Sequence, residues 1–186
     1  MRVTRNVVLL VLLPTTLLVP CSSGATTLVR QGLEVLTSQN AVIVRGKVLD
    51  LNAHWNAGHN FILTDVHIRP TEVFKGASSL DDLTFTVLGG TVGSITTLVI
   101  GTPELVPGST YLLFLNREDL PGATQRLTVR DLVQGAFDLV QGRAISQAAH
   151  FPLLADTRGL IEPPGGAEGM PVEEMVQRVH EVLGQR

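Results

Sequence analysis

Apolar and polar residues alternate along the first half of the chain with a period of two. The even positions of residues 42–49 carry Val42, Val44 and Val48, and the odd positions carry Ile43, Arg45, Lys47 and Leu49. A second alternation covers residues 62–68. This spacing is typical of strands that bury one face. The two runs flank a loop at residues 52–60, so we expect them to pair as a long antiparallel hairpin.

Several shorter apolar runs follow at intervals of about ten residues. Residues 83–88 alternate again, and residues 127–140 supply the last runs. Residues 111–115 are apolar on both faces, which predicts a fully buried central strand. Glycines such as Gly89 and Gly90 mark bends between them. Many short strands without intervening helices indicate a mainly β fold, either a small antiparallel barrel or a sandwich.

The two ends of the mature chain have helical patterns. Apolar residues after Pro171 recur at helical spacing through Val172, Met175 and Val179, which predicts an amphipathic C-terminal helix over residues 171–184. A short N-terminal helix is predicted over residues 28–36. Residues 157–170 contain consecutive prolines and glycines with no apolar pattern, and we interpret them as a linker.

The first residues have the form of a signal peptide. Arg2 and Arg5 precede an uncharged run, and small residues follow before Thr26. We expect a signal peptide at residues 1–25, a β-domain at residues 26–156, and a periplasmic or extracellular protein. An alternative is a membrane-anchored lipoprotein in which Cys21 is lipidated, although Pro20 departs from the small residue expected there.

Composition narrows the classes of partner and chemistry. The chain has 186 residues, a net charge of −3 and 14 basic residues, so it offers no basic field that would hold nucleic acid. The length fits one domain. Cys21 is the only cysteine, so no disulfide is expected within the chain. We expect contact with a membrane only through the leader or a lipid on Cys21.

No motif predicts catalysis. Neither Ser94 nor Ser109 has the glycine spacing of a nucleophile elbow, and the glycines at residues 89–93 lack the lysine of a phosphate loop. His54, His59 and His67 match no metal-ligand spacing. We therefore predict no catalytic residues, no metal and no cofactor, and keep a metal-dependent enzyme that uses these three histidines as an alternative.

The loop at residues 52–60 is the predicted binding region. It contains His54, His59 and the single tryptophan, Trp55. An aromatic side chain at a rim is a common contact residue, and these three are the candidate binding residues. The other interpretation is that Trp55 folds back and plugs the end of the β-domain.

The strand pattern also resembles known proteins. The segments carrying it are residues 71–76, the glycines at residues 89–93, and residues 101–115 with the sequence Tyr-Leu-Leu-Phe-Leu at their end. They resemble a group of uncharacterised exported bacterial proteins. In outline the stretch is similar to netrin-like or tissue-inhibitor-of-metalloproteinase-like modules, which implies an OB-like antiparallel β-barrel that binds protein surfaces without catalysis.

One departure limits that resemblance. Inhibitors of the latter family chelate a protease zinc through an N-terminal cysteine, and no cysteine is present here beyond Cys21. No functional residue is therefore carried over from the family. The sequence predicts an exported, non-catalytic module with a protein partner. A structural subunit that docks on another chain through its C-terminal helix is a further alternative.

Overall fold

The computed structural model describes residues 29–76, 81–151 and 168–184. The predicted signal peptide, Cys21, and residues 157–167 of the predicted linker lie outside this part of the chain. The fold is mainly β, with an antiparallel sheet and two α-helices, as the sequence pattern predicts. Among the described residues, no helix has the length and apolar character needed to cross a membrane.

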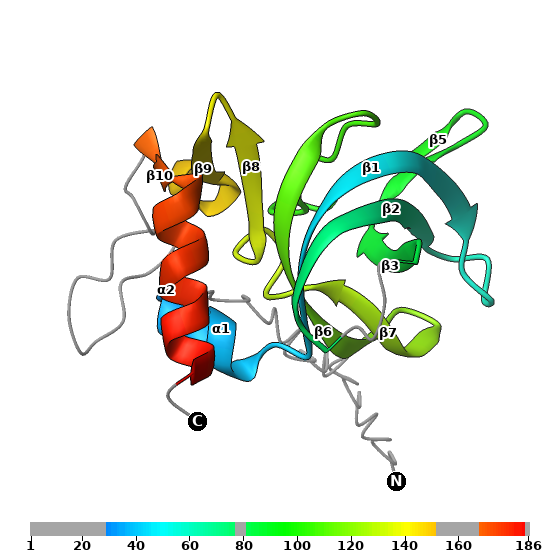
Figure 1. Ribbon diagram of the computed structural model, residues 1–186. Coiled ribbons are helices and arrows are strands. Elements are labelled where there is room, and N and C mark those ends of the chain that lie inside the picture. The colour runs from blue at the N-terminus through cyan, green and yellow to red at the C-terminus, as the bar shows by residue number, and fades with distance from the viewer. Residues whose placement is uncertain (1–28, 77–80, 152–167, 185–186) are drawn as a thin grey trace, which may run out of the picture.

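Eight strands form the main sheet. Their order is β10-β9-β8-β6-β1-β2-β3, and β7 pairs with the second half of β6. The sheet curves so that β3, at one edge, lies close to β7 (Figure 1). The bounds are β1 Val42–Trp55, β2 Ile62–Lys75, β3 Leu83–Leu88, β6 Thr110–Leu120, β7 Ala123–Val129, β8 Ala136–Val140, β9 Arg143–Ser146 and β10 Met170–Pro171.

The predicted hairpin is confirmed, with a shorter loop than expected. β1 continues through Trp55, which pairs with Ile62, so the connection covers only residues 56–61. Three register shifts interrupt the ladder, and one of them adjoins Gly46, which pairs with Pro70. Pro70 lies beyond the residues of β2 that pair with β3, so its missing N–H costs no hydrogen bond to that strand.

A second, two-stranded sheet follows β3. It consists of β4 (Gly90–Val92) and β5 (Ile95–Thr97), joined in a tight hairpin. Gly90 has φ +133°, and a Cβ there would lie 2.3 Å from Oγ1 of Thr64. A side chain at this position is therefore excluded, which explains the glycine at this bend.

Two apolar clusters lie on opposite faces of the main sheet. The inner cluster fills the concave face of the curved sheet, and the outer cluster lies between the sheet and the helices. β6 serves both, because Leu113 and Leu115 point inward while Leu112 and Phe114 point outward. The run at residues 111–115 is apolar on both faces for this reason, and the prediction of a fully buried central strand is confirmed.

Both helices contribute to the outer cluster. α2 (Val172–Gly184) matches the predicted C-terminal helix and buries Met175 and Val179. α1 (Leu33–Gln39) starts later than the predicted residues 28–36. The side chain of Gln134 explains the difference, because it bonds the backbone N–H of Gln31 and the carbonyl of Val29 and holds that segment extended.

Two short elements near the C-terminus have little sequence signal. β9 extends the sheet beyond β8, and a 3-10 helix, η1 (Gln147–His150), follows it. Met170, which falls within the predicted linker, pairs with Ala144 of β9 and is buried. Its burial against a strand that is distant in sequence ties the start of α2 to the sheet.

Candidate binding site

The three predicted binding residues lie near one end of the β1–β2 hairpin but point in different directions. His54 and Trp55 are the last residues of β1, and both are partly buried. Successive strand residues face opposite sides of a sheet, so these two side chains diverge. His59 lies in the loop, is exposed and has φ +51°. The structure does not bring the three into one cluster.

His54 is held on the outer face of the sheet. Its Nε2 lies 3.1 Å from Oδ2 of Asp65, and its Nδ1 lies 3.0 Å from the carbonyl oxygen of Trp55. Thr86 on β3 donates a 2.6 Å hydrogen bond to the other oxygen of Asp65. Both ring nitrogens therefore already face oxygen atoms of the protein, which fixes the orientation of the ring.

The loop that follows is organised by one buried side chain. Oδ1 of Asn56 accepts from the backbone N–H groups of Asn60 and Phe61, at 3.1 and 3.3 Å. Its Nδ2 donates to Oδ1 of Asn60 and to the carbonyl of Pro121, which belongs to the β6–β7 turn. Gly122 completes the fit, since a Cβ there would approach the Asn56 amide at 2.9 Å. The loop is thus fixed by internal bonds.

His67 lies further along β2, away from this loop. Its Nδ1 lies 3.3 Å from the hydroxyl of Thr84, and its Nε2 lies 3.9 Å from a carboxylate oxygen of Asp50. Within residues 29–76, 81–151 and 168–184, no group of three or more His, Cys, Asp or Glu side chains is arranged to hold a metal ion. His54, His59 and His67 are not brought together there.

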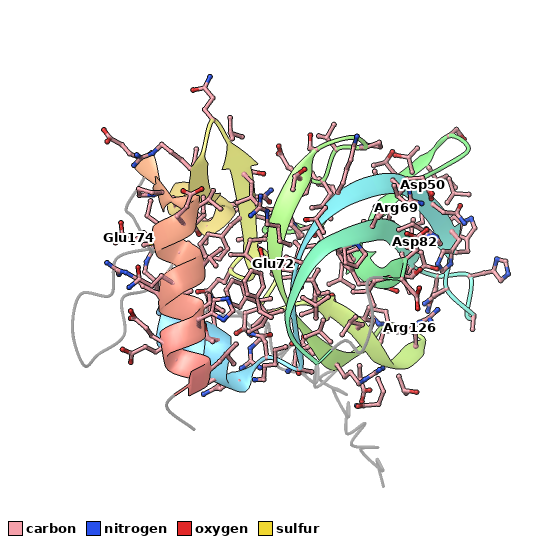
Figure 2. The ribbon with its side chains drawn as sticks, in the orientation of Figure 1. Asp50, Arg69, Glu72, Asp82, Arg126 and Glu174 are labelled. Carbon is pink, nitrogen blue, oxygen red and sulfur yellow. The ribbon has the colours of Figure 1, made fainter. Side chains whose placement is uncertain are left out.

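The outer face of β1–β3 is polar and largely paired. Asp50, Arg69 and Asp82 gather there (Figure 2). Arg69 makes two hydrogen bonds to Asp82, at 3.0 and 3.2 Å. The hydrogen bond from Arg69 lowers the pKa of Asp82, and the same bond raises the pKa of Arg69. This ion pair is exposed to solvent, where such pairs add little stability.

In contrast to this polar face, β5 and the loop after it expose apolar side chains. Leu98 and Ile100 are 85% and 82% exposed, and Ile95 and Val106 are also exposed. No charged residue occurs from Leu83 to Pro103. The β4–β5 hairpin that leads into this segment projects from the main sheet (Figure 1). We call the side chains of Ile95, Leu98, Ile100 and Val106 the apolar surface.

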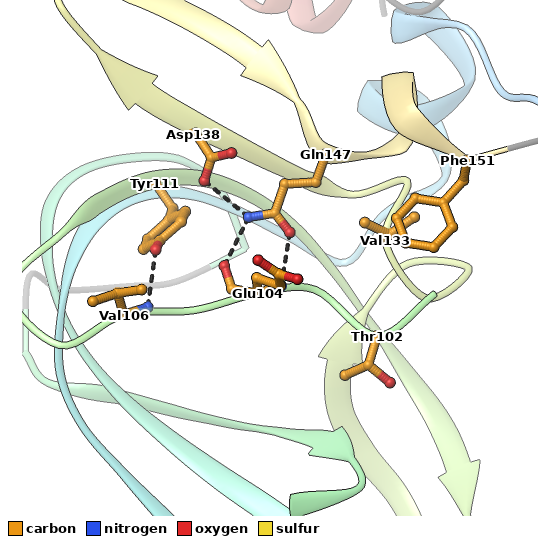
Figure 3. Close-up of a pocket in the computed structure, with 8 residues that line it drawn as sticks. All are labelled: Thr102, Glu104, Val106, Tyr111, Val133, Asp138, Gln147 and Phe151. Carbon is orange, nitrogen blue, oxygen red and sulfur yellow. Dashed lines mark hydrogen bonds between the residues drawn. The ribbon is translucent and has the colours of Figure 1, made fainter. Parts of the chain in front are cut away.

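The loop that carries the apolar surface continues into the wall of a cavity. The cavity has a volume of about 390 Å³, within the range of small-ligand sites. It lies between the residues 102–106, the start of β6, β8 and the segment after β9 (Figure 3). Its lining residues are Thr102, Glu104, Val106, Tyr111, Val133, Asp138, Gln147 and Phe151.

The side chain of Gln147 joins the walls of this cavity. Its Oε1 accepts from the N–H of Glu104 at 2.9 Å, and its Nε2 donates to the carbonyl of Glu104 at 2.8 Å. The same Nε2 donates to Oδ1 of Asp138 at 2.9 Å (Figure 3). Gln147 thus pairs with the loop as a neighbouring strand would and fixes it against β8.

Other polar groups of the cavity have unused capacity. Tyr111 is 3% exposed, and its hydroxyl accepts a 2.9 Å bond from the N–H of Val106. Neither Glu104 nor Asp138 forms an ion pair with any side chain that the structure describes. The cavity therefore presents two acidic groups beside apolar walls.

A smaller cavity lies where β3 approaches β7. It has a volume of about 40 Å³, enough for a water molecule, and Glu118 of β6 lines it beside Val87 and Val129. Partial burial, together with the nearby charge of Asp131, raises the pKa of Glu118. Glu118 is half-buried near the end of β6.

The cavity residues were not among the sequence predictions. Tyr111 was predicted only as part of a buried strand, and Glu104, Asp138 and Gln147 are single polar residues in segments far apart along the chain. One signal was available: a long uncharged segment that ends at Glu104. Its exposed apolar side chains appear only when the fold is known.

Comparison with known proteins assigns neither a family nor a function to the chain. No protein-family model matches the chain, and no curated protein matches it at a significant level. The family resemblance seen in the sequence therefore remains a prediction.

Proposed function

We propose that this protein is an exported, non-catalytic binding module that acts at the bacterial envelope or outside the cell, with a protein as its partner. The single observation that carries the proposal is the exposure of Leu98 and Ile100 on a loop that also forms the wall of a cavity. Uncommitted apolar side chains beside a cavity are typical of interaction sites.

We further propose that the curved sheet is an OB-like barrel, in which β1, β2, β3, β7 and β6 follow one another around the wall. Hydrogen-bonded pairing of β1 with β2, β2 with β3, β6 with β7 and β1 with β6 supports four of the five contacts. The proximity of β3 to β7 supports the fifth. Barrels of this type present loops and one sheet face to ligands.

The first residues support export. Arg2 and Arg5, the uncharged run that follows and the small residues before Thr26 have the three-part form of a leader. An anchored form would carry a lipid on Cys21 in place of cleavage after Ala25. A mass spectrum of the mature N-terminus separates the two, because the lipid adduct and a free Thr26 exclude each other.

The two alternatives receive less support. A metal-dependent enzyme would need His54, His59 and His67 at one point, and the engaged nitrogens of His54 do not favour it. A subunit that docks through its C-terminal helix would need a free apolar face on α2. Met175 and Val179 already pack within this chain, which favours a structural role for that face.

A capture experiment tests the proposed surface. The mature protein is immobilised and exposed to the solubilised envelope and culture fluid of its own source, and captured proteins are quantified by mass spectrometry. The double variant Leu98→Asp with Ile100→Asp should lose the specific partner by at least tenfold, since it places charges in the apolar surface. Its melting temperature should not change, because both side chains are exposed.

A matched control adds the same two charges nearby. Ser94→Asp with Thr96→Asp alters exposed polar residues of the β4–β5 hairpin and should keep the partner. Equal capture by the wild type and the Leu98/Ile100 variant would contradict the proposal that this surface binds. Equal loss in both double variants would mean that added charge alone, rather than loss of the apolar surface, prevents binding.

A further inference from the structure

The cavity beside the apolar surface is built as a defined site. Gln147 is 9% exposed and uses both amide protons and its carbonyl oxygen to hold the loop at Glu104 against Asp138. The bonds to the loop use only backbone atoms of Glu104, so its carboxylate is not needed to hold the wall. The walls are thus preorganised by Gln147 without the Glu104 carboxylate and with only one carboxylate oxygen of Asp138.

The charge of the cavity favours a cation. Glu104 and Asp138 are the two ionisable acids of the lining, and no Lys, Arg or His is among the lining residues that the structure describes. Asp138 uses Oδ1 to accept from Gln147, which leaves Oδ2 free to accept from a ligand. Two carboxylates in a recess attract positively charged groups and repel anions.

The remaining walls favour an organic cation with an apolar portion. Val106, Val133 and Phe151 supply apolar surface to the same cavity. The buried hydroxyl of Tyr111 accepts a bond from Val106 and keeps its own proton unpaired within the described residues. Because this buried O–H lacks an acceptor within the wall, a polar ligand could supply one.

We propose that the cavity binds an organic cation: a positively charged nitrogen with N–H donors on a short apolar stem, as in an alkylammonium. The nitrogen lies between the carboxylates of Glu104 and Asp138, and the stem contacts Val133 and Phe151. The same chemistry comes from two sources, the side chain of a lysine on the protein partner or a free small amine. The inference rests on the proposed function and adds the ligand class.

Three small probes test the charge preference. Butylammonium, butanol and butyrate share a stem and differ in charge, and each is titrated into the isotopically labelled full-length protein while backbone amide shifts are followed by NMR. Butylammonium should give saturable shifts at the residues lining the cavity, while butanol should bind at least threefold more weakly and butyrate not at all. Added salt should weaken butylammonium binding.

Variants locate the site. Glu104→Gln keeps the backbone bonds to Gln147 and should weaken butylammonium binding at least threefold, and Asp138→Asn should do the same. Glu173→Gln removes the same charge from an exposed position on α2 and should have no effect. Binding that Glu104→Gln and Asp138→Asn leave unchanged would overturn the proposal, as would the absence of saturable shifts up to about 50 mM butylammonium.

Two peptides separate the sources of the cation. A short blocked peptide containing lysine is compared with the same peptide containing norleucine, which has a similar stem without the charge. Tighter binding of the lysine peptide than of butylammonium assigns the cation to a partner's side chain. Binding of butylammonium with equal or greater affinity assigns it to a free amine.

Failure of this inference can be told apart from failure of the proposed function. Partner capture that depends on Leu98 and Ile100, without any response to butylammonium, would overturn the ligand class and leave the binding module intact. Butylammonium binding that needs Glu104, without partner capture, would support the cavity and contradict the protein partner.

Discussion

Two polar regions of this protein differ in whether their groups are satisfied within the chain. Around the β1–β2 loop, His54 faces two acceptors and the Asn56 amide makes four hydrogen bonds. Around the cavity, Gln147 is fully engaged, but Glu104, Asp138 and the Tyr111 hydroxyl keep unused capacity. Polar residues in the first region stabilise the fold, and those in the second are available to a ligand.

The difference shows why residue type alone is a poor guide to a site. Histidine and tryptophan in a loop attract attention in a sequence, yet His54 is used to hold the sheet face. Leu98 and Ile100 are ordinary in a sequence, yet their exposure is unusual in the fold. A binding surface is recognised by what its groups leave unsatisfied.

The largest loss of stability should come from a change in the β1–β2 loop. Asn56→Ala removes four side-chain hydrogen bonds of a buried residue, so we expect a loss of about 2–3 kcal/mol in the free energy of unfolding. This corresponds to a fall of about 5–10 °C in the melting temperature. Asn52→Ala, at an exposed position of β1, is the matched control and should change little. An unchanged melting temperature for Asn56→Ala would show that the loop is not held as described.

A smaller effect is expected at the cavity wall. Gln147→Ala removes three hydrogen bonds and should cost about 1–2 kcal/mol in stability. Hydrogen exchange gives the sharper measurement, because the amide of Glu104 loses its acceptor and should lose protection. Gln177→Ala on α2 is the control and should leave that amide protected. Protection that survives in Gln147→Ala would mean that other contacts hold the loop.

Glu118 offers a test with a defined pH dependence. Burial raises its pKa in the folded state, so the folded protein loses stability as pH rises through that value and Glu118 ionises. Glu118→Gln should therefore have a higher melting temperature than the wild type at pH 7. The difference should vanish at about pH 3.5, where the acid is protonated in both states. A lower melting temperature for the variant at pH 7 would contradict this.

The smallest effect is expected on the polar face of the sheet. Asp82→Asn breaks the exposed ion pair with Arg69 and should leave the melting temperature within error of the wild type. Differential scanning calorimetry at low and moderate salt would measure it. A clear loss of stability would show that this face depends on its charges, and that its polar groups stabilise the fold as those of the β1–β2 loop do.

Local patterns predicted the strands well, because each buried face repeats every second residue. Val42, Val44 and Val48 point inward as expected. The outer cluster was harder to predict, since Ile43 alternates with the same periodicity as Arg45 and Lys47 and is buried only because the helices cover it. The early helix was misplaced for a related reason: Gln134, distant in sequence, holds residues 29–31 extended.

The site was less predictable than the fold. The cavity depends on contacts between residues 104, 138 and 147, which no local pattern connects. Its recognition requires the curvature of the sheet and the path of the loop after β5. The predicted candidates His54, Trp55 and His59 were chosen by residue type, and the hydrogen bonds that occupy the His54 ring become visible only in three dimensions.

The central claim is that the apolar surface, and not the β1–β2 loop, binds the partner. A single capture assay that compares variants of the two tests it most directly. The account predicts that Leu98→Asp with Ile100→Asp abolishes capture of the specific partner, whereas His54→Ala with Trp55→Ala, still folded at the assay temperature, retains it. Loss of the partner in the folded His54/Trp55 variant, with full capture by the Leu98/Ile100 variant, would place the binding surface at the β1–β2 loop and contradict the account.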